Sequence, residues 1–343
     1  MKKKSHSPTI SDVAKRAGVS APAVSRVLSA DKDFVVRDET RQRIIDAAKE
    51  LDYQPSQMAR GLRVSRTFSL GIVTPELDNP VHARIIYGAE RAAADHGYSL
   101  LIAHRSPDMD EVSIYERLVR HNRVDGLIVA TLQNEQTGVP ALKKLDHPFV
   151  LVNRKAKGVP HYVVIDDEGG SKKAVEHLVA LGHRRIAHLA GESHRYNAKC
   201  RLRGYKHGLK EAGLAYEAGL VVESGYTQYG GATAMRQLLG SNVKRPTAIF
   251  AATLLAAAGA MSVLREEGIR VPEDISIVGF NDGSIAEVLA PPLTTVRTPI
   301  DEMGYQATSA LIKHIEGDEE FVGTTLPSTE IVLRASTAAV SRS

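Results

Sequence analysis

The stretch that decides the fold is TISDVAKRAGVSAPAVSRVLS, residues 9–29. Thr9 and Asp12 have the spacing of a capping box, which predicts the start of a short helix. Gly18 enters a left-handed turn more readily than residues with a Cβ atom, so it predicts the end of that helix. Ser20 can cap a second helix, and Pro22 lies in its first turn, where a missing N–H group costs little. The stretch therefore predicts a helix-turn-helix.

Each of the two predicted helices has an apolar side and a polar side. The apolar side consists of Val13, Ala14, Ala17, Val24, Val27 and Leu28. The residues that then point outward from the second helix are Ala21, Pro22, Ser25 and Arg26. In DNA-binding proteins the second helix of this motif enters the major groove. The alternative, from spacing alone, is an ordinary helical hairpin with a polar outer surface.

A third helix is expected to complete a small all-α domain at residues 9–55. Either Asp38 or Thr40 can open it, and it is expected to run to Leu51. Its apolar side consists of Ile44, Ala47, Ala48 and Leu51. Packed against the first two helices, that side closes a three-helix unit.

Residues 9–63 closely resemble the DNA-binding headpiece of the LacI/GalR family of bacterial repressors. The matching strings are Asp12-Val13-Ala14, Ala17-Gly18-Val19-Ser20, Val24-Ser25-Arg26-Val27-Leu28 and Leu51-Asp52-Tyr53-Gln54-Pro55. The resemblance implies that base edges are contacted by Ala21, Pro22 and Arg26, and phosphates by Ser20, Ser25 and Ser29. Because Ala21 and Pro22 carry no hydrogen-bond donor, direct readout is expected to depend on Arg26, on thymine methyl groups and on DNA deformability.

Pro55 is expected to end this unit, and SQMARGLR, residues 56–63, follows it. So short a segment with an internal glycine forms a poor isolated helix. The family resemblance implies a hinge helix that folds when a dimer is bound to its operator, with Leu62 wedged between base pairs in the minor groove. The operator is then expected to be palindromic, with a flexible pyrimidine–purine step at its centre. A plain flexible linker is the alternative.

Positive charge is concentrated at the head of the chain. Residues 1–63 hold thirteen Lys or Arg against eight Asp or Glu, whereas the remaining chain holds 31 against 32. A basic head on a near-neutral body suits a protein whose head neutralises phosphates, so we expect double-stranded DNA as a partner. Residues 1–8 are expected to form a disordered basic arm.

Composition argues against several other classes of protein. The 343 residues allow two or three compact units, and no apolar run reaches the length of a membrane span. The basic residues 1–4 are not followed by the apolar segment of a signal peptide, so we expect a cytoplasmic protein with no membrane partner. Cys200 is the only cysteine, which excludes an internal disulfide and a cysteine-built zinc site. We expect no cofactor and no metal.

From Phe68 onward, short apolar runs alternate with helical stretches. The first series has expected strands at 69–73, 98–103, 125–130 and 149–152, with helices at 81–96 and 111–121. The second has expected strands at 161–166, 185–190, 220–222, 248–252 and 275–280, with helices at 169–182, 198–212, 230–239 and 256–268. This alternation predicts parallel sheets with right-handed crossovers. The fold expected is an α/β effector domain of two doubly wound parallel-sheet subdomains with a cleft between them, like that of periplasmic binding proteins.

Further strings in the body match the same family, so the resemblance covers nearly the whole chain. They include Gly71-Ile72-Val73, Asp125-Gly126-Leu127-Ile128, Leu181-Gly182-His183-Arg184-Arg185-Ile186-Ala187, Arg201-Leu202-Arg203-Gly204-Tyr205, Val271-Pro272-Glu273-Asp274 and Pro291-Pro292-Leu293-Thr294-Thr295. The resemblance implies crossings between the subdomains near residues 165, 293 and 328.

These crossings set the expected domain boundaries. The hinge is placed at 56–66, the effector-binding and dimerisation domain at 67–333 and a tail at 334–343. The N-subdomain is placed at about 67–165 and 294–327, and the C-subdomain at about 166–293 and 328–333. The tail lacks the leucine heptads that join two dimers into a tetramer, so we expect a homodimer.

Ligands of such folds bind at the carboxyl ends of strands, in the cleft. The residues expected there, at positions where the family places effector contacts, are Asn79, His82, Arg154, Arg201, Tyr226, Thr253, Asn281 and Asp282. Structural alternatives exist for each of them. Loop Asn and Asp residues cap helices, an aromatic ring can simply close the cleft, an arginine can pair with a structural carboxylate, and loop charges are often merely solvated.

Two departures from the family pattern bear on the effector. Sugar-binding members usually carry Asn-Asp where this chain has Thr253-Leu254, and Asp-Asp where it has Asn281-Asp282. The cationic side chains expected around the cleft are His82, Arg154, Lys199 and Arg201. Because arginine binds carboxylates and phosphates through paired hydrogen bonds, we expect a sugar acid or a phosphorylated sugar rather than a neutral sugar.

The function expected is that of a ligand-responsive transcription regulator: a repressor of carbohydrate or sugar-acid utilisation genes that a small molecule releases from DNA. A purine- or nucleoside-responsive regulator, or a corepressor-dependent one, is the alternative within this fold. An enzyme is disfavoured, since the acidic Asp166-Asp167-Glu168 has neither Walker spacing nor a dinucleotide fingerprint beside it, and no nucleophile elbow occurs. A solute-binding protein is disfavoured by the DNA-binding head and the missing export signal.

Overall fold

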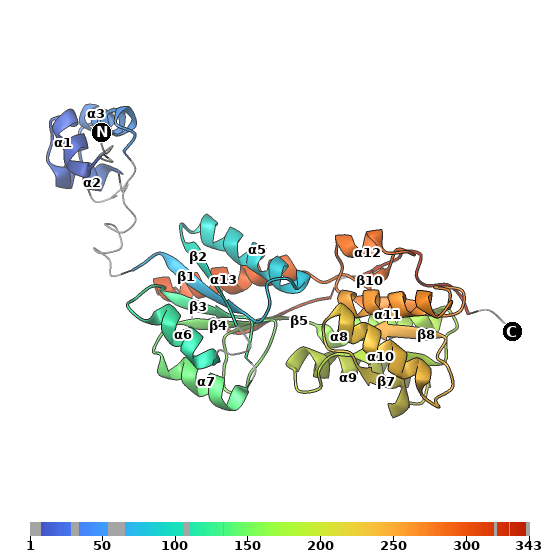
Figure 1. The fold of residues 1–343 in the computed structure, drawn as a ribbon. Helices are drawn as coiled ribbons and strands as arrows, with labels where there is room; N and C mark the ends of the chain where they lie inside the picture. The colour runs from blue at the N-terminus through green and yellow to red at the C-terminus, as the bar shows by residue number, and fades with distance from the viewer. Residues whose placement is uncertain are drawn as a thin grey trace, which may run out of the picture. The chain divides into compact units, whose positions relative to one another are not determined.

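The computed structural model describes residues 8–28, 34–53, 66–105, 110–132, 134–318, 321–328 and 330–340. Figure 1 shows the elements of two compact units, which comprise Met1–Phe68 and Ser69–Ser343. The arm expected at residues 1–8, apart from Pro8, and the expected hinge helix with Leu62 lie outside the described residues, as does Ser29.

The first unit contains three helices, α1 (Ile10–Ala17), α2 (Ala21–Leu28) and α3 (Asp38–Glu50). Thr9 and Asp12 form both hydrogen bonds of the capping box at the start of α1, and Gly18 follows its end with φ 66° and ψ 39°. Arg37 precedes α3 without a side-chain capping bond. The three helices share one core, made of Val13, Ala14, Ala17, Val24, Val27, Ile44, Ala47 and Ala48. The predicted helix-turn-helix is confirmed.

The first subdomain of the second unit is built on a parallel sheet with the order β11-β5-β4-β3-β1-β2. Its strands are β1 (Ser69–Thr74), β2 (Ser99–His104), β3 (Gly126–Val129), β4 (Phe149–Val152), β5 (Tyr162–Ile165) and β11 (Thr324–Leu326). Helices α5 (Pro80–Asp95) and α13 (Ile300–Glu316) pack together on one face, as Figure 1 shows. Helices α6 (Glu111–Val119) and α7 (Glu135–Lys144) cover the other face.

The second subdomain has the sheet order β12-β10-β9-β8-β6-β7, parallel except for the pair of β10 and β12. Its strands are β6 (Ile186–Ala190), β7 (Val221–Glu223), β8 (Ala248–Ala251), β9 (Ser276–Phe280), β10 (Thr294–Val296) and β12 (Ile331–Val332). Helices α8 (Asp167–Ala180) and α9 (Tyr196–Glu211) pack on one face, and α10 (Gln228–Gly240) and α11 (Leu254–Glu266) on the other. A short 3₁₀ turn (Ala218–Leu220) precedes β7, and α12 (Ser284–Val288) follows β9.

Two expected boundaries differ from the structure. β10 pairs with β9 in the second sheet, so the chain crosses after Val296 and residues 294–296 belong to the second subdomain. The expected tail is also part of that subdomain up to residue 340. The fully buried Ser336 accepts a backbone hydrogen bond from Ile277 at 2.8 Å, and Val340 donates one to Leu181 at 2.9 Å. Long-range backbone pairing, which no local pattern reveals, fixes both boundaries.

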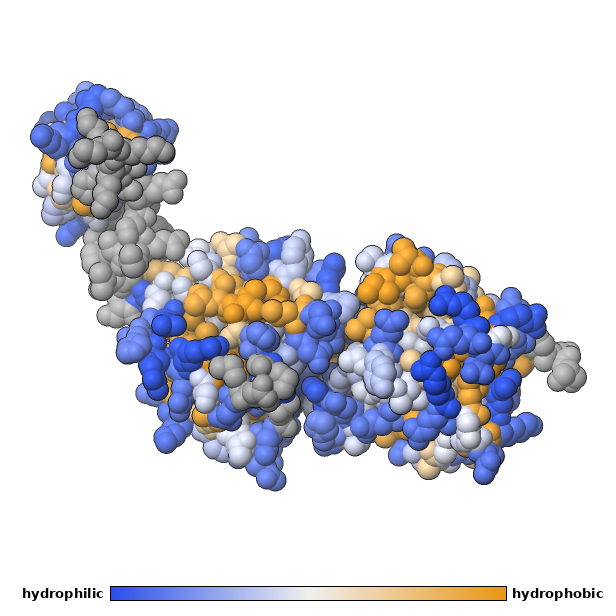
Figure 2. All heavy atoms as spheres, in the orientation of Figure 1, coloured by the Kyte–Doolittle hydropathy of each residue, from blue (hydrophilic) through white to orange (hydrophobic). Residues whose placement is uncertain are grey.

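Several elements were not expected from the sequence. Strands β10, β11 and β12 are only two or three residues long, which is too short for an alternating pattern to show. Helix α7 contains Gly138 and Pro140, which lower its intrinsic helix propensity. In Figure 2 the visible surface is hollowed between the two subdomains, beside α12. None of the helices described here is long and apolar enough to cross a membrane.

Candidate functional site

One side of α2 forms an exposed face of the first unit. Ser20 caps this helix, its Oγ accepting a hydrogen bond from the Ala23 amide at 3.4 Å. Pro22 and Arg26 are exposed one turn apart, and Ala21 and Ser25 beside them are half-buried. The Arg26 guanidinium lies 5.3 Å from the centroid of the Phe34 ring. Five of the seven expected DNA contacts thus lie on α2 or at its cap, and Ser29 and Leu62 are not described.

Two adjoining pockets lie between the subdomains, at the carboxyl ends of the strands. We call them the large compartment, with a volume of about 590 Å³, and the small compartment, with about 60 Å³. The residues that line both are Asn79, Val81, Tyr226, Thr253 and Asn281. Of the other expected ligand residues, Asp282 lines the large compartment, and His82, Arg154 and Arg201 line the small one. The fold therefore brings all eight expected residues together.

Helix starts position two of these side chains. Asn79 caps α5, its Oδ1 accepting from the Val81 amide at 3.1 Å. Thr253 caps α11 in the same way, its Oγ1 accepting from the Ala256 amide at 3.0 Å. Each of these oxygens satisfies an amide of the first helical turn that would otherwise have no partner. Both residues lie at the cleft, but these oxygens are already engaged in capping.

Arg201 is buried and held by protein groups on each of its nitrogen atoms. Nε and Nη2 both contact the Asp167 carboxylate at 2.8 Å, and Nη1 donates to the Ala252 carbonyl at 2.5 Å. The guanidinium also lies 4.2 Å from the centroid of the Phe280 ring. The charge of Arg201 is therefore balanced within the second subdomain. This agrees with the alternative that this arginine pairs with a structural carboxylate.

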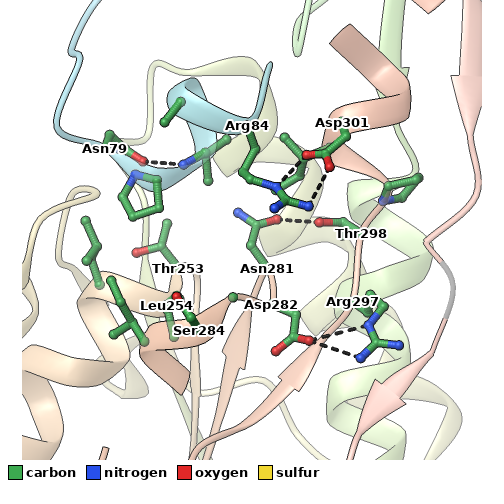
Figure 3. Close-up of a pocket in the computed structure, with 18 of the residues that line it drawn as sticks. Asn79, Arg84, Thr253, Leu254, Asn281, Asp282, Ser284, Arg297, Thr298 and Asp301 are labelled. Carbon is green, nitrogen blue, oxygen red and sulfur yellow. Dashed lines mark hydrogen bonds and ion pairs between the residues drawn. The ribbon is translucent and has the colours of Figure 1, made fainter. Parts of the chain in front are cut away.

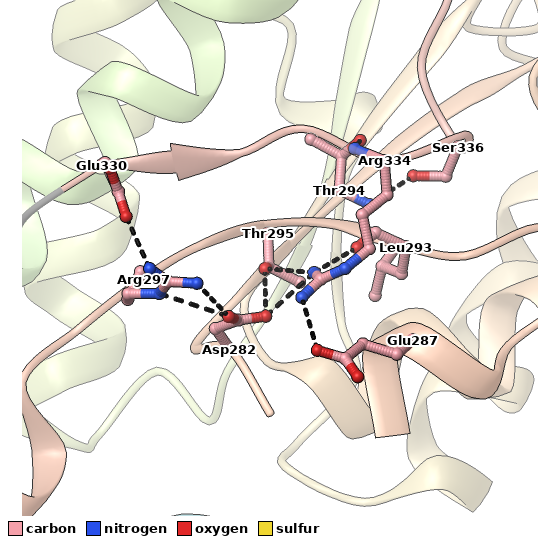
Figure 4. Close-up of polar contacts among 9 residues, drawn as sticks. All are labelled: Asp282, Glu287, Leu293, Thr294, Thr295, Arg297, Glu330, Arg334 and Ser336. Carbon is pink, nitrogen blue, oxygen red and sulfur yellow. Dashed lines mark hydrogen bonds and ion pairs between the residues drawn. The ribbon is translucent and has the colours of Figure 1, made fainter. Parts of the chain in front are cut away.

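Asp282 has a similar structural engagement, which Figure 4 shows. Its Oδ1 accepts from Thr295 at 2.7 Å and lies 2.9 Å from Arg334, and its Oδ2 lies 3.3 Å from Arg297. Burial acts to raise the pKa of Asp282, but the hydrogen bonds from Arg334, Thr295 and Arg297 outweigh it, so the pKa lies below its ordinary value. The carboxylate is therefore ionised. It is bound by Thr295 and Arg334 of its own subdomain and by Arg297 on the segment that crosses to the other subdomain.

Three residues that line the small compartment each have one buried polar atom without a hydrogen-bond partner in the described part of the chain. These atoms are His82 Nδ1, Arg154 Nε and Asn281 Nδ2. Asn281 is 3% exposed, and its Oδ1 accepts from Thr298 at 2.8 Å. Leaving a buried polar group without a hydrogen bond costs free energy, so we expect a ligand or water to bind these atoms.

Burial alters the charge of two of these groups. It lowers the pKa of His82 to about 4, despite an opposing hydrogen bond to the Glu76 backbone, so this ring is neutral at pH 7. It also lowers the pKa of Arg154, outweighing the attraction of Glu135 and Glu111. The Arg154 side chain is 13% exposed, and Glu135 approaches it only to 3.8 Å. The small compartment therefore contains a cation whose charge is incompletely balanced.

The expected pattern of positive charge needs correction. His82 is neutral, Arg201 is paired, and Lys199 is exposed and does not line either compartment. Arg154 remains, and Arg195 joins it in lining the small compartment, where it forms an ion pair with Glu192. Sequence reasoning had not selected Arg195, Tyr196 or Asn197, although all three follow the carboxyl end of β6 at the start of α9.

Two asparagines at strand ends carry unusual backbone conformations. Asn153 follows β4 with φ 62°, and Asn281 follows β9 with φ 69°. Asparagine tolerates this left-handed region better than most residues with a Cβ atom. Both line the small compartment, so their strained backbones belong to the site. No group of three or more His, Cys, Asp or Glu side chains that could hold a metal occurs in the described ranges.

A helix-turn-helix unit followed by a two-subdomain body with a ligand-sized cleft is the architecture of a DNA-binding transcription regulator with an effector domain. Residues 9–56 match the lacI family of bacterial regulatory proteins, and residues 175–337 match a periplasmic binding protein-like domain. The chain belongs to the lacI family, which consists of DNA-binding regulators rather than enzymes.

Three similar proteins illustrate the relationship. The HTH-type transcriptional repressor PurR of Haemophilus influenzae (strain ATCC 51907 / DSM 11121 / KW20 / Rd) is 35% identical over 92% of this chain and 93% of its own length. A solved complex of the transcriptional regulator CelR with cellobiose is 34% identical, with a TM-score of 0.73, over 96% of this chain and 99% of that one. The Lac repressor dimer bound to operator and the anti-inducer ONPF is 29% identical, with a TM-score of 0.84, over 97% and 100%.

Proposed function

We propose that this regulator is a repressor that binds a palindromic operator as a homodimer and is released by a small molecule in its cleft. The observation that carries the proposal is the exposed side of the capped helix α2, on which Pro22 and Arg26 lie one turn apart. A protein of this kind acts where the chromosome lies, so we place it in the cytoplasm. The Lac repressor dimer on its operator supports the proposed assembly.

Within that assembly, Ala21, Pro22 and Arg26 contact bases, and Ser20, Ser25 and Ser29 contact phosphates. Leu62 wedges into the minor groove at the centre of the operator. The proposed domain limits follow the structure where it describes the chain, with the second subdomain extended to include residues 294–296 and 334–340.

For the effector we propose an anionic carbohydrate, a sugar acid or a sugar phosphate. Arg154 in the small compartment lacks a full counter-charge, and Asn281, which lines the same compartment, has an unpartnered donor in its Nδ2. A carboxylate or phosphate supplies the negative charge and the acceptor oxygens that both groups need. The CelR complex with cellobiose supports a carbohydrate as the general class.

A purine or nucleoside is the second candidate. The Tyr226 ring lines both compartments, and the Arg195 guanidinium lies 5.5 Å from its centroid. A planar base can stack on an aromatic or guanidinium surface of this kind. The similarity to the PurR repressors favours keeping this class under test.

Selection of operator DNA tests the proposal directly. The full chain is used to enrich sites from a random double-stranded library, and the enriched sites are sequenced. A palindromic consensus is expected, and its affinity is then measured for the wild type and for Arg26→Ala. We expect the substitution to cost about 1–3 kcal/mol on the selected site and to relax the base preference at one position of each half-site.

Random-sequence DNA is the control for Arg26→Ala. An equal loss of affinity on random and selected DNA would show that Arg26 contacts phosphate only. Lys15→Ala is a matched substitution, because Lys15 is exposed on α1 rather than on α2. It should weaken selected and random DNA alike, or neither.

A further inference from the structure

The two compartments of the cleft differ sharply in chemistry. Three residues that line the small compartment carry unpartnered buried atoms, Arg154 Nε, His82 Nδ1 and Asn281 Nδ2, and of these residues Asn281 alone also lines the large compartment. At about 60 Å³ the small compartment has room for about four to six water-sized groups, so it accommodates a carboxylate or phosphate rather than a whole effector. The large compartment, at about 590 Å³, is of the size of a typical small-molecule site.

Polar side chains around the large compartment are mostly committed to one another, as Figure 3 shows. Arg84 donates to both oxygens of Asp301 at 2.5 Å, and Thr298 donates to Asn281 at 2.8 Å. Asp282 is held by Arg297 and by groups of its own subdomain, and Thr253 caps α11. Apolar side chains make up much of the remaining wall: Pro80, Val81, Leu254, Leu255, Ile285 and Ile300.

The two compartments therefore favour different chemical groups at the two ends of a ligand. Hydroxyl groups placed against the apolar side chains of the large compartment would lose water without gaining a hydrogen bond, which costs free energy. An apolar group placed there is stabilised in proportion to the area it removes from water. At the other end, the buried Arg154 is stabilised by an anion, because Glu135 and Glu111 balance its charge incompletely.

We propose that the effector is an amphiphilic anion: a carboxylate or phosphate head in the small compartment joined to an apolar group, of about the size of a phenyl ring, in the large one. Tyr226, Thr253 and Asn281 line both compartments, so one ligand can span them without a barrier of protein between its ends. This inference rests on one part of the proposed function, namely that the effector binds in the cleft.

Matched compounds separate the two features. Isothermal titration of the full chain compares phenyl β-D-glucuronide with D-glucuronate, which lacks the ring, and with phenyl β-D-glucoside, which lacks the charge. Phenyl phosphate and inorganic phosphate form a second pair that distinguishes a phosphate head from a carboxylate. In the glucuronide series or the phosphate series, the compound that carries both the phenyl ring and the negative charge is expected to bind at least tenfold more tightly than the compounds that lack one of them.

Variants assign each feature to its compartment. Ile285→Ser should weaken the phenyl-bearing anion at least threefold and leave D-glucuronate or inorganic phosphate unchanged. Val288→Ser is the matched control, because Val288 is on the same helix, is 82% exposed and does not line either compartment. Arg154→Gln should weaken the anions at least tenfold and leave phenyl β-D-glucoside unchanged.

Three results would overturn the inference: no gain from the phenyl group in either series, equal effects of Ile285→Ser and Val288→Ser, or no binding of any of the five compounds at millimolar concentration. Operator selection is a separate readout for the proposed function. If the selection succeeds and the titrations fail, the regulator stands and the ligand class falls. If an amphiphilic anion binds but leaves operator affinity unchanged, the ligand class stands and the proposed release mechanism falls.

Discussion

Arginine side chains of the cleft illustrate how their immediate neighbours set what an ionised group can do. Arg201 and Arg154 both line the small compartment, but only Arg201 has a buried carboxylate in contact with its guanidinium. Arg154 has Glu135 at 3.8 Å, and that carboxylate is 47% exposed and therefore screened by water. A buried charge with so weak a partner is destabilised unless a ligand supplies the counter-charge. We therefore assign anion binding to Arg154 and a structural role to Arg201.

Asp282→Asn tests the structural role of the half-buried Asp282, which lines the large compartment. Removing its charge leaves Arg334, whose side chain is 11% exposed, with a weaker partner. We expect the free energy of unfolding at pH 7 to fall by about 1–3 kcal/mol, measured by urea denaturation. Glu330→Gln is the control: Glu330 pairs with Arg297 on the surface, where both side chains are about half exposed, so the loss should stay below about 1 kcal/mol.

The effect of Asp282→Asn should depend on pH with a definite sign. The pKa of Asp282 in the folded protein is lowered from its ordinary 3.8, so its ionised form stabilises the fold above that value. This stabilisation is lost as the pH falls from about 4 through the lowered value. The difference in stability between wild type and variant should therefore be full at pH 7 and shrink below pH 4. A difference that is constant down to pH 3 would contradict the assigned ion pairs.

Pairs of helices in the body cross at glycines, which allow their backbones to approach closely. A Cβ atom on Gly88 of α5 would lie 1.9 Å from the Asp301 carbonyl oxygen of α13, and one on Gly304 would lie 2.2 Å from that of Ile85. α10 and α11 cross at Gly231 and Gly259 in the same way. These crossings hold the amino-terminal ends of α5, α11 and α13 around the large compartment. The close packing of these helices therefore sets the position of the residues that line the large compartment.

Gly88→Ala tests the crossing of α5 with α13. The added methyl group must displace backbone rather than a flexible side chain, so we expect a loss of about 1–3 kcal/mol or more in thermal or urea unfolding. Gly240→Ala is the matched control, since Gly240 is the last residue of α10 and nothing lies within 4 Å of its Cβ position. Replacing glycine there should be neutral or stabilise by up to about 1 kcal/mol. Equal effects of the two substitutions would show that the helices can separate at little cost.

On the scale of the whole molecule, the cleft can regulate DNA binding only if the ligand prefers one arrangement of the subdomains. Three crossing segments join these subdomains, and Arg297, on the second crossing, contacts Glu330 on the third and Asp282 at the end of β9 (Figure 4). These ion pairs connect the ligand site to the segments that must bend when the cleft closes. We therefore expect cleft closure and operator affinity to be thermodynamically linked.

Linkage makes a reciprocal prediction about the complete regulator. The tightest-binding of the five test compounds should lower the affinity for the selected operator by about 5–150-fold, measured by fluorescence anisotropy. Saturating operator should lower the affinity for that compound by the same factor. Arg154→Gln should bind operator as the wild type does but lose the response to the compound. A compound that leaves operator affinity unchanged, or tightens it, would contradict release by an inducer; equality of the two factors checks that both titrations are at equilibrium.

The local features of this protein follow from short-range patterns in its sequence. The capping box of Thr9 with Asp12, the turn at Gly18 and the apolar periodicity of three helices specify the headpiece, because each depends on residues a few positions apart. Alternating strands and helices likewise specified two sheets and the edge at which the expected ligand residues gather.

Which of the gathered side chains remain able to bind a ligand depends on contacts between segments far apart in the sequence. Asp167 and Arg201 are 34 positions apart, and Asp282 meets Arg334 through the packing of segment 334–340 against the second subdomain. Long-range contacts also place β10 in the second sheet and pair Arg84 with Asp301 and Thr298 with Asn281 around the large compartment. The physical reason is that burial and pairing depend on partners distant in sequence, whereas caps and periodicity depend on neighbours along the chain.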